Sequence, residues 1–180
     1  MSEQAGKIRQ MFEQISPRYN LLNKLMTAGQ DIRLRLEAIR RLGVIDGLRI
    51  IDIGCGTGDI ALQIVQKYKN VQVVACDFTP GMLYVARQRK TSDKVAWVIA
   101  DAMALPFVDD TFDRAISGFL LRNAMDTRLA LSEQFRILRS DGIVVSLDTT
   151  PPGSGLLKPL IRVYLHFSGD VFVGVVLGTS

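Results

Sequence analysis

The sequence predicts one α/β domain built on a mostly parallel, doubly wound sheet. Three observations support this fold class. Short β-branched segments alternate with helical segments between residues 48 and 147, a glycine-rich run follows the first of these segments, and acidic residues follow the next two. Strands that alternate with helices need crossover connections, which make neighbouring strands parallel. The length of 180 residues suits one such domain.

The composition is that of a folded protein with no strong preference for charged partners. Hydrophobic residues make up 48% of the chain, charged residues 22%, and the net charge is +4. There is no block of lysine or arginine, so we expect no nucleic-acid partner. The slight basic excess fits a solvated surface or contact with an anionic membrane. Cys55 and Cys76 lack disulfide or metal-ligand spacing, so no metal site is expected.

The amino terminus carries no signal-peptide core, and no apolar run approaches the roughly 18 residues of a membrane-spanning helix. We therefore expect a cytoplasmic protein. Apolar residues recur at three- and four-residue steps over residues 7–26, with a break at Pro17, which predicts two short helices. Residues 31–42 predict another helix, with Asp31 as its N-cap and Gly43 just past its end. These helices pack against the sheet or, alternatively, cover a substrate pocket.

The chain divides into a helical cap, an α/β core and a C-terminal segment, at residues 1–45, 46–150 and 151–180. In the core, the apolar segments that predict strands are residues 48–53, 71–76, 95–100, 112–117 and 142–147. The predicted helices are residues 60–68, 81–90 and 128–138, the second of which begins near Thr79 or Pro80.

The C-terminal segment has a different character. The sequence PPG stops the fifth strand, and a predicted helix at residues 156–167 places Lys158, Arg162 and His166 on one face. Residues 171–177 are apolar again. An apolar segment at a chain end is unusual, so we expect the natural protein to continue and the final antiparallel strands to be missing. If these strands are missing, a sheet edge lies exposed and could pair with another chain.

The glycine-rich run, Ile51–Asp59 (IDIGCGTGD), lies between a predicted strand and a predicted helix. In open parallel sheets, ligands bind at the carboxyl ends of the strands, and glycines let the backbone approach them closely. The spacing lacks the longer last gap of the dinucleotide fingerprint and the lysine of a phosphate-binding P-loop. The run therefore predicts a nucleoside site, although a glycine-rich loop alone is a weak signal.

Two acidic residues strengthen this prediction. Asp77 ends the second strand, where a carboxylate can accept hydrogen bonds from both hydroxyls of a ribose. Asp101 follows the third strand, where carboxylate and backbone groups meet an adenine edge. Asp77 is also expected in NAD enzymes, whereas Asp101 favours another nucleoside. For either aspartate alone, a helix N-cap or a turn is the structural alternative.

Together these residues resemble the class I S-adenosylmethionine-dependent methyltransferases, with a Rossmann-like fold. They resemble more closely the C-methyltransferases of menaquinone and ubiquinone biosynthesis (UbiE/MenG). The similar stretches are residues 11–23 (MFEQISPRYNLLN), the glycine motif, residues 101–113 (DAMALPFVDDTFD) and residues 117–123 (SGFLLRN). The first and last of these are typical of this family rather than of methyltransferases in general. The resemblance extends from about Lys7 to Pro152.

The chain departs from the family at several positions. Leu120 stands where the family usually has glycine, and Leu34 stands where it usually has tryptophan. After the fifth strand, residues 148–151 (DTTP) replace the usual acidic residue and FSKP. Family members also continue further, with the last strands of the sheet.

The resemblance implies that S-adenosylmethionine is the cofactor. Asp77 would hold the ribose, while Asp101 and the Ala102 amide would contact the adenine. Thr57 and Ser117 would line the methionine side. The full set of expected cofactor-binding residues is Asp52, Gly54, Gly56, Thr57, Gly58, Asp77, Phe78, Met82, Asp101, Ala102 and Ser117.

The implied methyl acceptor is a ring carbon of a polyprenylated quinol, such as demethylmenaquinol. Loss of the neighbouring phenolic proton makes that carbon nucleophilic. Arg122, Asn123 and Tyr19 are the candidates to hold a catalytic water or to stabilise the phenolate. The alternative for Arg122 and Asn123 is a structural turn after the fourth strand. His166, the sole histidine, fits a surface or interface position better than catalysis.

A prenyl tail implies contact with a membrane surface without crossing it, through residues 7–26 and 156–167. The alternative for both segments is packing on the sheet or in a homodimer. Three other functions stay open: another small-molecule methyltransferase, a NAD-binding oxidoreductase and a non-catalytic nucleoside-binding fragment. The glycine spacing and Asp101 argue against the oxidoreductase.

Overall fold

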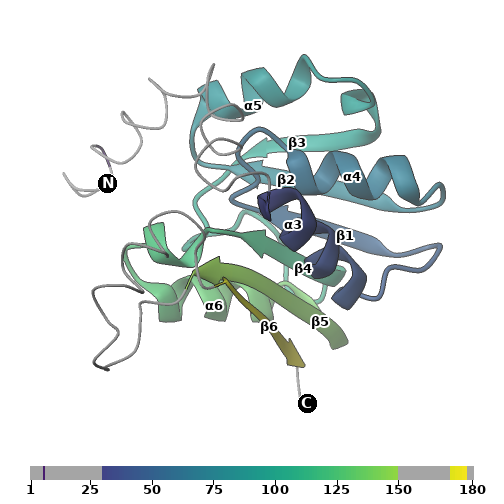
Figure 1. The fold of residues 1–180 in the computed structure, drawn as a ribbon. Coiled ribbons are helices and arrows are strands. Elements are labelled where there is room, and N and C mark those ends of the chain that lie inside the picture. The colour runs from purple at the N-terminus through teal and green to yellow at the C-terminus, as the bar shows by residue number, and fades with distance from the viewer. Residues whose placement is uncertain (1–5, 7–29, 150–170, 178–180) are drawn as a thin grey trace, which may run out of the picture.

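The computed structural model describes residue 6, residues 30–149 and residues 171–177. They contain a six-stranded sheet with the order β3-β2-β1-β4-β5-β6 (Figure 1). The strands are β1 (Arg49–Ile53), β2 (Gln72–Asp77), β3 (Val95–Ile99), β4 (Phe112–Gly118), β5 (Leu138–Thr149) and β6 (Val171–Leu177). Strands β1 to β5 are parallel, and β6 is antiparallel to β5. The predicted doubly wound, mostly parallel sheet is therefore confirmed.

Helices cover both faces of the sheet (Figure 1). The helices are α3 (Gln30–Arg41), α4 (Asp59–Lys67), α5 (Pro80–Arg87) and α6 (Thr127–Arg136), with short 3-10 turns η2 (Ser92–Lys94) and η3 (Leu121–Asn123). Buried residues of α3 and α4 form one core cluster with the sheet. The end of α6 and the segment after β3 contribute to a second cluster.

The two faces explain why β1 is apolar almost without interruption. Ile50 and Ile51 are both fully buried, and successive residues of a strand point to opposite faces. Ile50 belongs to the cluster with α3 and α4, whereas Ile51 belongs to the cluster with the end of α6. A strand buried on both faces has no position for solvated side chains, as is typical of parallel sheets.

Local signals define the helix starts near the site. Thr79 is the N-cap of α5, and Pro80 occupies the first turn, where its missing N–H costs nothing. Asp126 caps α6 by accepting a hydrogen bond of 3.0 Å from the Leu129 N–H. Both helices therefore begin where their sequences predict a start, within one residue or two.

Two boundary predictions were wrong. Asp31 is not an N-cap, because it lies inside α3 and its carboxylate pairs with Arg35 one turn along. Leu138 does not end α6. It begins β5, where it pairs with Phe112, and the ladder shifts register immediately afterwards. A β-bulge of this kind adds strand residues that periodicity alone assigns to the preceding helix.

An antiparallel strand lies beside β5. The apolar segment Val171–Leu177 forms β6 and pairs along β5 from Ile143 to Thr149. The predicted helices at residues 7–26 and 156–167 lie outside the described residues. Among the helices that the structure describes, none combines the length and apolar character that crossing a membrane requires.

The strand order places the site. The chain moves outward from β1 to β2 and β3, and then returns to β4 on the other side of β1. The loops after β1 and β4 therefore diverge, which leaves a crevice at the carboxyl ends of the strands.

Candidate functional site

A cavity opens at this crevice. Its empty space, counted with its open mouth, is about 840 Å³. Eight residues predicted for the site line it: Gly54, Gly56, Asp77, Phe78, Met82, Asp101, Ala102 and Asn123. They come from four segments that the sequence separates widely, and the switch in strand order brings them together.

Asp77 is fixed from two directions. Its Oδ2 accepts a hydrogen bond of 2.8 Å from the Gly56 N–H, and its Oδ1 accepts one of 2.8 Å from the Thr79 N–H. Burial raises the pKa of the Asp77 carboxyl, and the two N–H donors partly offset this rise. Asp77 thus ties the glycine loop to the start of α5 and still has lone pairs available to a ligand.

Asp101 also lines the cavity, but it is exposed and fixed only within its own turn. Its Oδ1 accepts a hydrogen bond of 2.9 Å from the Met103 N–H, and its carbonyl accepts one of 3.0 Å from the Ala104 N–H. The turn-forming alternative for this aspartate therefore holds at the same time as its position in the cavity.

The glycine loop uses its glycines for two different purposes. Gly54 lines the cavity with φ +66°, and a Cβ there would lie 2.7 Å from Leu120 Cδ1. Gly58, with φ +81°, is the N-cap of α4 and does not line the cavity. A Cβ at Gly58 would lie 2.5 Å from Cη2 of Trp97. Gly58 therefore allows the loop to pack against β3, a structural role that the sequence did not indicate.

Asp52 lies beneath the loop and is 1% exposed. Its Oδ2 accepts a hydrogen bond of 3.0 Å from the Ala61 N–H, while its Oδ1 has no partner among the described residues. Burial raises the pKa of Asp52 to about 7; the Ala61 N–H and the charge of Arg35 lower it, and Asp77 and Asp59 raise it. Asp52 faces a second, smaller cavity, which Arg35, Asp59 and the loop also line.

Two predicted residues on the methionine side do not line the main cavity. Thr57 is 2% exposed and lines the smaller cavity instead. Ser117 is 1% exposed, and its hydroxyl lies 3.1 Å from that of Ser146 on β5. The adjacent Gly118 lines both cavities, so backbone rather than the Ser117 side chain borders the space there.

The turn after β4 carries the predicted catalytic residues. Phe119 has φ +60°, an uncommon conformation for a bulky residue, and its ring lies 4.9 Å from the Arg122 guanidinium. Arg122 does not line the cavity; its Nε lies 4.0 Å from Asp148 Oδ1, and its backbone N–H donates to Asp148 Oδ2. Asn123 lines the cavity and donates from Nδ2 to the Phe119 carbonyl at 3.0 Å. Tyr19 lies outside the described residues.

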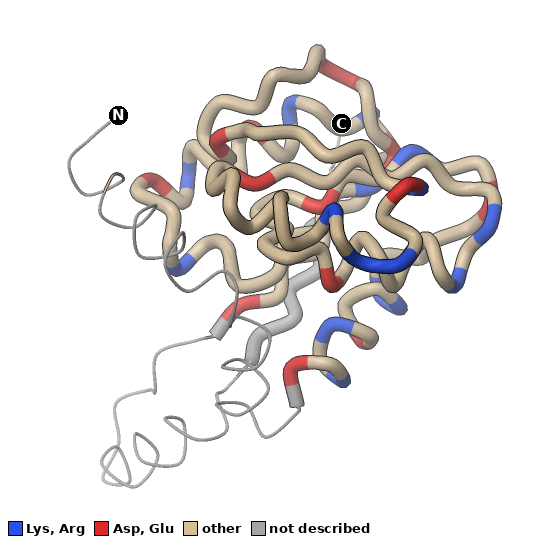
Figure 2. The backbone as a smooth tube through the Cα atoms, turned by 90° about the horizontal axis from the view of Figure 1, so that it is seen from above, with Lys and Arg blue, Asp and Glu red and all other residues tan. Residues whose placement is uncertain are grey.

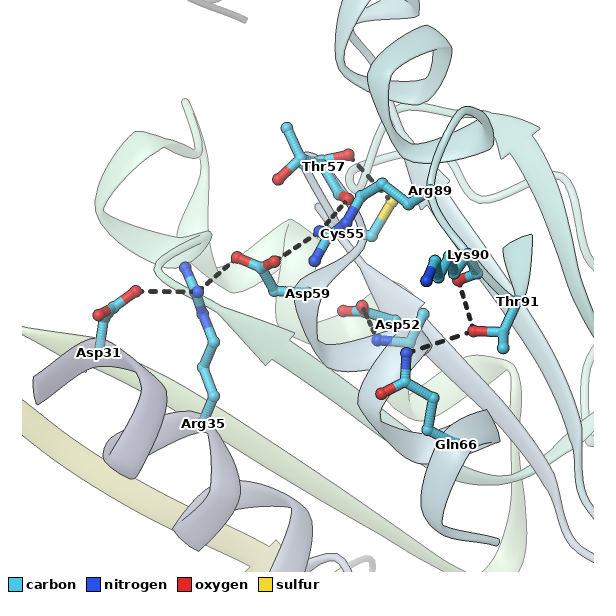
Figure 3. Close-up of polar contacts among 12 residues, drawn as sticks. Asp31, Arg35, Asp52, Cys55, Thr57, Asp59, Gln66, Arg89, Lys90 and Thr91 are labelled. Atoms are coloured by element: carbon cyan, nitrogen blue, oxygen red, sulfur yellow. Dashed lines mark hydrogen bonds and ion pairs between the residues drawn. The ribbon is translucent and has the colours of Figure 1, made fainter. Parts of the chain in front are cut away.

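An ion-pair chain links α3 to the glycine loop (Figure 3). Arg35 Nη1 lies 3.0 Å from Asp31 Oδ2 and 2.5 Å from Asp59 Oδ2. Arg89 Nη1 lies 2.5 Å from Asp59 Oδ1 and 2.7 Å from the Thr57 carbonyl oxygen, to which it donates. This chain could not be identified from the sequence, because its contacts join residues up to 32 positions apart and no local spacing marks them.

Several cavity residues were also missed: Thr79, Ala100, Met103, Gly118, Phe119, Leu120, Ala124 and Met125. Thr79 and Met103 each lie two residues after a predicted acidic ligand, so a wider window would have included them. Ala100 directly precedes Asp101, at the end of β3. The others lie at the end of β4 and in the turn after it, where the side chains give no polar signal in the sequence.

The two cysteines are free thiols of low expected reactivity. Cys76 is buried and Cys55 is partly buried. Burial, the largest cause, raises the pKa of both thiols, and the nearby charge of Asp52 adds to it. Basic and acidic residues are interspersed over the described part of the chain (Figure 2).

Comparisons with known proteins show which family this chain resembles. A family model described as the ubiE/COQ5 methyltransferase family matches residues 1–175. The ubiquinone/menaquinone biosynthesis C-methyltransferase UbiE of Desulfotalea psychrophila is 38% identical over 160 residues, which cover 89% of this chain and 65% of that protein. The demethylmenaquinone methyltransferase of Thermus thermophilus is 39% identical over 170 residues, covering 91% of this chain and 77% of the relative. The chain thus spans about two thirds of the length of the first of these relatives.

Solved structures share the fold. A phosphoethanolamine N-methyltransferase of Haemonchus contortus, in complex with phosphomonomethylethanolamine and S-adenosylhomocysteine, is 28% identical. It has a TM-score of 0.63, and the match covers 74% of this chain and 32% of that one. The [4+2]-cyclase SpnF is 24% identical with a TM-score of 0.72, and covers 84% of this chain and 62% of its own. Because one of these proteins is a cyclase, the fold alone does not fix the reaction.

Proposed function

Because the chain belongs to the ubiE/COQ5 methyltransferase family, we propose that it methylates a ring carbon of a prenylated quinol with S-adenosylmethionine as the methyl donor. One observation carries the proposal. A cavity at the switch point of the sheet is bordered by the glycine loop, by Asp77 and by Asp101. This is the arrangement that a nucleoside with an extended side chain requires.

The residues present fit this donor. Asp77 keeps acceptor capacity for ribose hydroxyls, and Asp101 with the Ala102 amide borders the place proposed for the adenine. The buried Oδ1 of Asp52 has no hydrogen-bond partner among the described residues, which is costly for a polar atom. We propose that the bound donor supplies this partner. Bound S-adenosylmethionine supplies a methyl group that is already activated on a positively charged sulfur.

The strand order suggests how the ligands lie. Adenine and ribose at the ends of β3 and β2 leave the ends of β1 and β4 for the methionine part and the acceptor. That side of the cavity is apolar, with Phe119, Leu120, Ala124 and Met125. An apolar wall suits a quinol ring and excludes water, and alignment of the reacting atoms there can supply several kcal/mol of the barrier reduction.

Asn123 is the best-placed residue for the acceptor hydroxyl. Its Nδ2 is engaged by the Phe119 carbonyl, so its Oδ1 is the atom that we propose accepts a hydrogen bond from the phenol or from a water. The Arg122 guanidinium lies 4.9 Å from the centre of the Phe119 ring, and we propose that its charge favours the phenolate. For Arg122→Ala we expect unchanged S-adenosylhomocysteine affinity with reduced turnover. Unimpaired turnover would remove Arg122 from the mechanism.

The names of the relatives suggest the acceptor. The Thermus thermophilus relative is named a demethylmenaquinone methyltransferase, and the Desulfotalea psychrophila relative is named for ubiquinone and menaquinone biosynthesis. We propose demethylmenaquinol, a naphthoquinol, as the acceptor. Its prenyl tail would bring the protein to the membrane surface, where exposed Ile32 and Leu36 of α3 are available for contact. Flotation with anionic liposomes at low salt tests this docking, which an absence of binding would contradict.

The decisive test is a methyl-transfer assay with two acceptors. Demethylmenaquinol and a benzoquinol analogue are offered with S-adenosylmethionine, and methylated product is measured by mass spectrometry. We expect methylation of the naphthoquinol. Methylation of neither ring, together with calorimetric binding of S-adenosylhomocysteine but not NAD, would favour a methyltransferase with another small acceptor. Binding of neither nucleotide would leave a fragment without cofactor function.

A further inference from the structure

Arg35 is a buried charge that the proposed reaction does not use. It belongs to α3, outside the strands and loops that line the main cavity, and is 6% exposed. Its guanidinium pairs with Asp31 on its own helix and with Asp59, the first residue of α4. Asp59 directly follows Gly58, so Arg35 contacts the end of the glycine loop (Figure 3).

The network holds Asp59 from both sides. Arg35 pairs with one carboxylate oxygen, and Arg89, which follows α5, pairs with the other. Arg89 also binds the Thr57 carbonyl, so both residues that flank Gly58 are tied to charged groups. A carboxylate gripped on both oxygens by two guanidinium groups has little freedom to rotate. The loop therefore ends at a fixed position.

Arg35 also reaches the other side of the cavity. Its guanidinium carbon lies 6.0 Å from the centre of the Phe119 ring, which sits in the strained turn after β4. Arg35 lines the smaller cavity together with Gly54 and Gly118, one residue from each side. The Arg35 guanidinium thus forms an ion pair on the glycine-loop side of the crevice and lies over the Phe119 ring on the β4 side.

The energetic cost argues that this geometry has a purpose. Removing a guanidinium and its carboxylate partners from water carries a desolvation cost that their mutual attraction can fail to offset. Apolar side chains of similar volume would fill the same space without that cost. Apolar side chains would not fix the orientation of the two segments, because van der Waals contacts have little directional preference. Short charged hydrogen bonds do have one.

We infer that Arg35 is a positioning residue for the nucleoside cofactor, and that it fixes the glycine loop and the turn after β4 relative to each other. The inference rests on the proposed function for the identity of that cofactor. It makes α3, a helix that precedes the sheet, part of the cofactor site through Asp59. Arg35 acts through Asp59 and Phe119 and is not itself a catalytic residue.

The test compares S-adenosylhomocysteine affinity and thermal unfolding for the full chain and its variants, by calorimetry at a temperature where each variant is folded. Arg35→Met is expected to weaken binding by about tenfold. Arg40→Met is the matched control. Arg40 lies on the same helix in an exposed ion pair with Glu37, and its loss should change affinity less than about twofold.

Two further variants separate positioning from loss of structure. Arg35→Lys keeps the charge and should recover part of the lost affinity. The double variant with Asp59→Asn should lose less affinity than the two single losses multiplied together, because both changes break the Arg35–Asp59 link and only Asp59→Asn also weakens the pair with Arg89. If Arg35→Met does not fold, Asp59→Asn carries the test alone and should weaken binding.

The outcomes that overturn the inference are specific. They are wild-type affinity in folded Arg35→Met or Asp59→Asn, no recovery with lysine, or losses from the two changes that simply add. Wild-type protein that does not bind S-adenosylhomocysteine would instead defeat the proposed function. The two failures are therefore distinguishable in one set of titrations.

Discussion

The ends of β2 and β3 each present an aspartate to the same cavity, but the structure holds the two carboxylates differently. Asp77 accepts hydrogen bonds from N–H groups of two separate segments, the glycine loop and the start of α5. Asp101 accepts one N–H from its own turn and is exposed. The end of β2 is therefore part of the rigid frame of the site, whereas the end of β3 is a local turn at its rim. We expect ligand affinity to depend much more on Asp77 than on Asp101.

The largest effect should come from Asp77→Asn. The variant loses a charged acceptor for ribose, and one of its two oxygens becomes an NH₂ group that faces an N–H donor. We expect S-adenosylhomocysteine affinity to fall by roughly 30- to 100-fold, as for the loss of hydrogen bonds to a charged group. Calorimetric titration measures this change. Asp93→Asn, at an exposed aspartate of η2, is the control and should bind as the wild type does. A change of less than threefold for Asp77→Asn would remove Asp77 from the frame.

The packing between the glycine loop and β3 can be broken without touching either aspartate. In Gly58→Ala, the new Cβ would lie 2.5 Å from the Trp97 ring at φ +81°. We expect the free energy of unfolding to fall by about 2–3 kcal/mol, from backbone strain and overpacking together. Chemical denaturation measures the loss.

Gly47→Ala is a matched control for that experiment. Gly47 has φ +89°, but nothing lies within 4 Å of its Cβ position. Its substitution should cost only about 1 kcal/mol, the backbone strain alone. Equal losses in the two variants would mean that the contact with Trp97 does not constrain the loop.

The site residues differ in how well the sequence identifies them. The glycine run, Asp77 and Asp101 each follow a predicted strand. Because parallel strands end at one edge of the sheet, the sequence predicts that these residues lie close together. The roles of Gly58 and Ser117 could not, because they depend on packing against Trp97 and Ser146 from other strands. Long-range contacts of this kind leave no periodic signal.

The parallel strands were easier to predict than the strand register and the ion pairs. Alternating apolar segments identified all five parallel strands within a few residues. The β-bulge that lengthens β5 and the pairing of β6 depend on register between strands, which local pattern does not encode. Likewise, nothing local to Asp31 distinguishes a helix cap from the ion pair that it makes with Arg35.

The end of β1 adds a third aspartate, whose stability effect depends on pH. Burial raises the pKa of Asp52 to about 7, above its unfolded value of 3.8. The folded state thus binds this proton more tightly, so stability from this group is complete below pH 3.8 and is lost as pH rises through 7. Asp52→Asn removes that loss. We expect its melting temperature to exceed that of the wild type by about 3 °C at pH 8, with a smaller difference at pH 5. A difference that does not grow with pH would contradict the assignment.

The smallest effect should come from Asp101→Ala. The carboxylate is exposed to water, and among the described residues it accepts a hydrogen bond from the Met103 N–H. That bond stabilises a turn that is also held by the hydrogen bond from the Ala104 N–H to the Asp101 carbonyl. A solvated contact with an adenine edge exchanges one hydrogen bond for another with water, so its net value is low. We expect S-adenosylhomocysteine affinity to fall by about three- to fivefold in the titration used for Asp77→Asn, with the melting temperature nearly unchanged. A loss as large as that of Asp77→Asn would mean that the ligand closes over the end of β3 and removes Asp101 from water. The end of β3 would then hold the ligand as firmly as the end of β2 does. The difference between the two strand ends would hold only for the protein without its ligand.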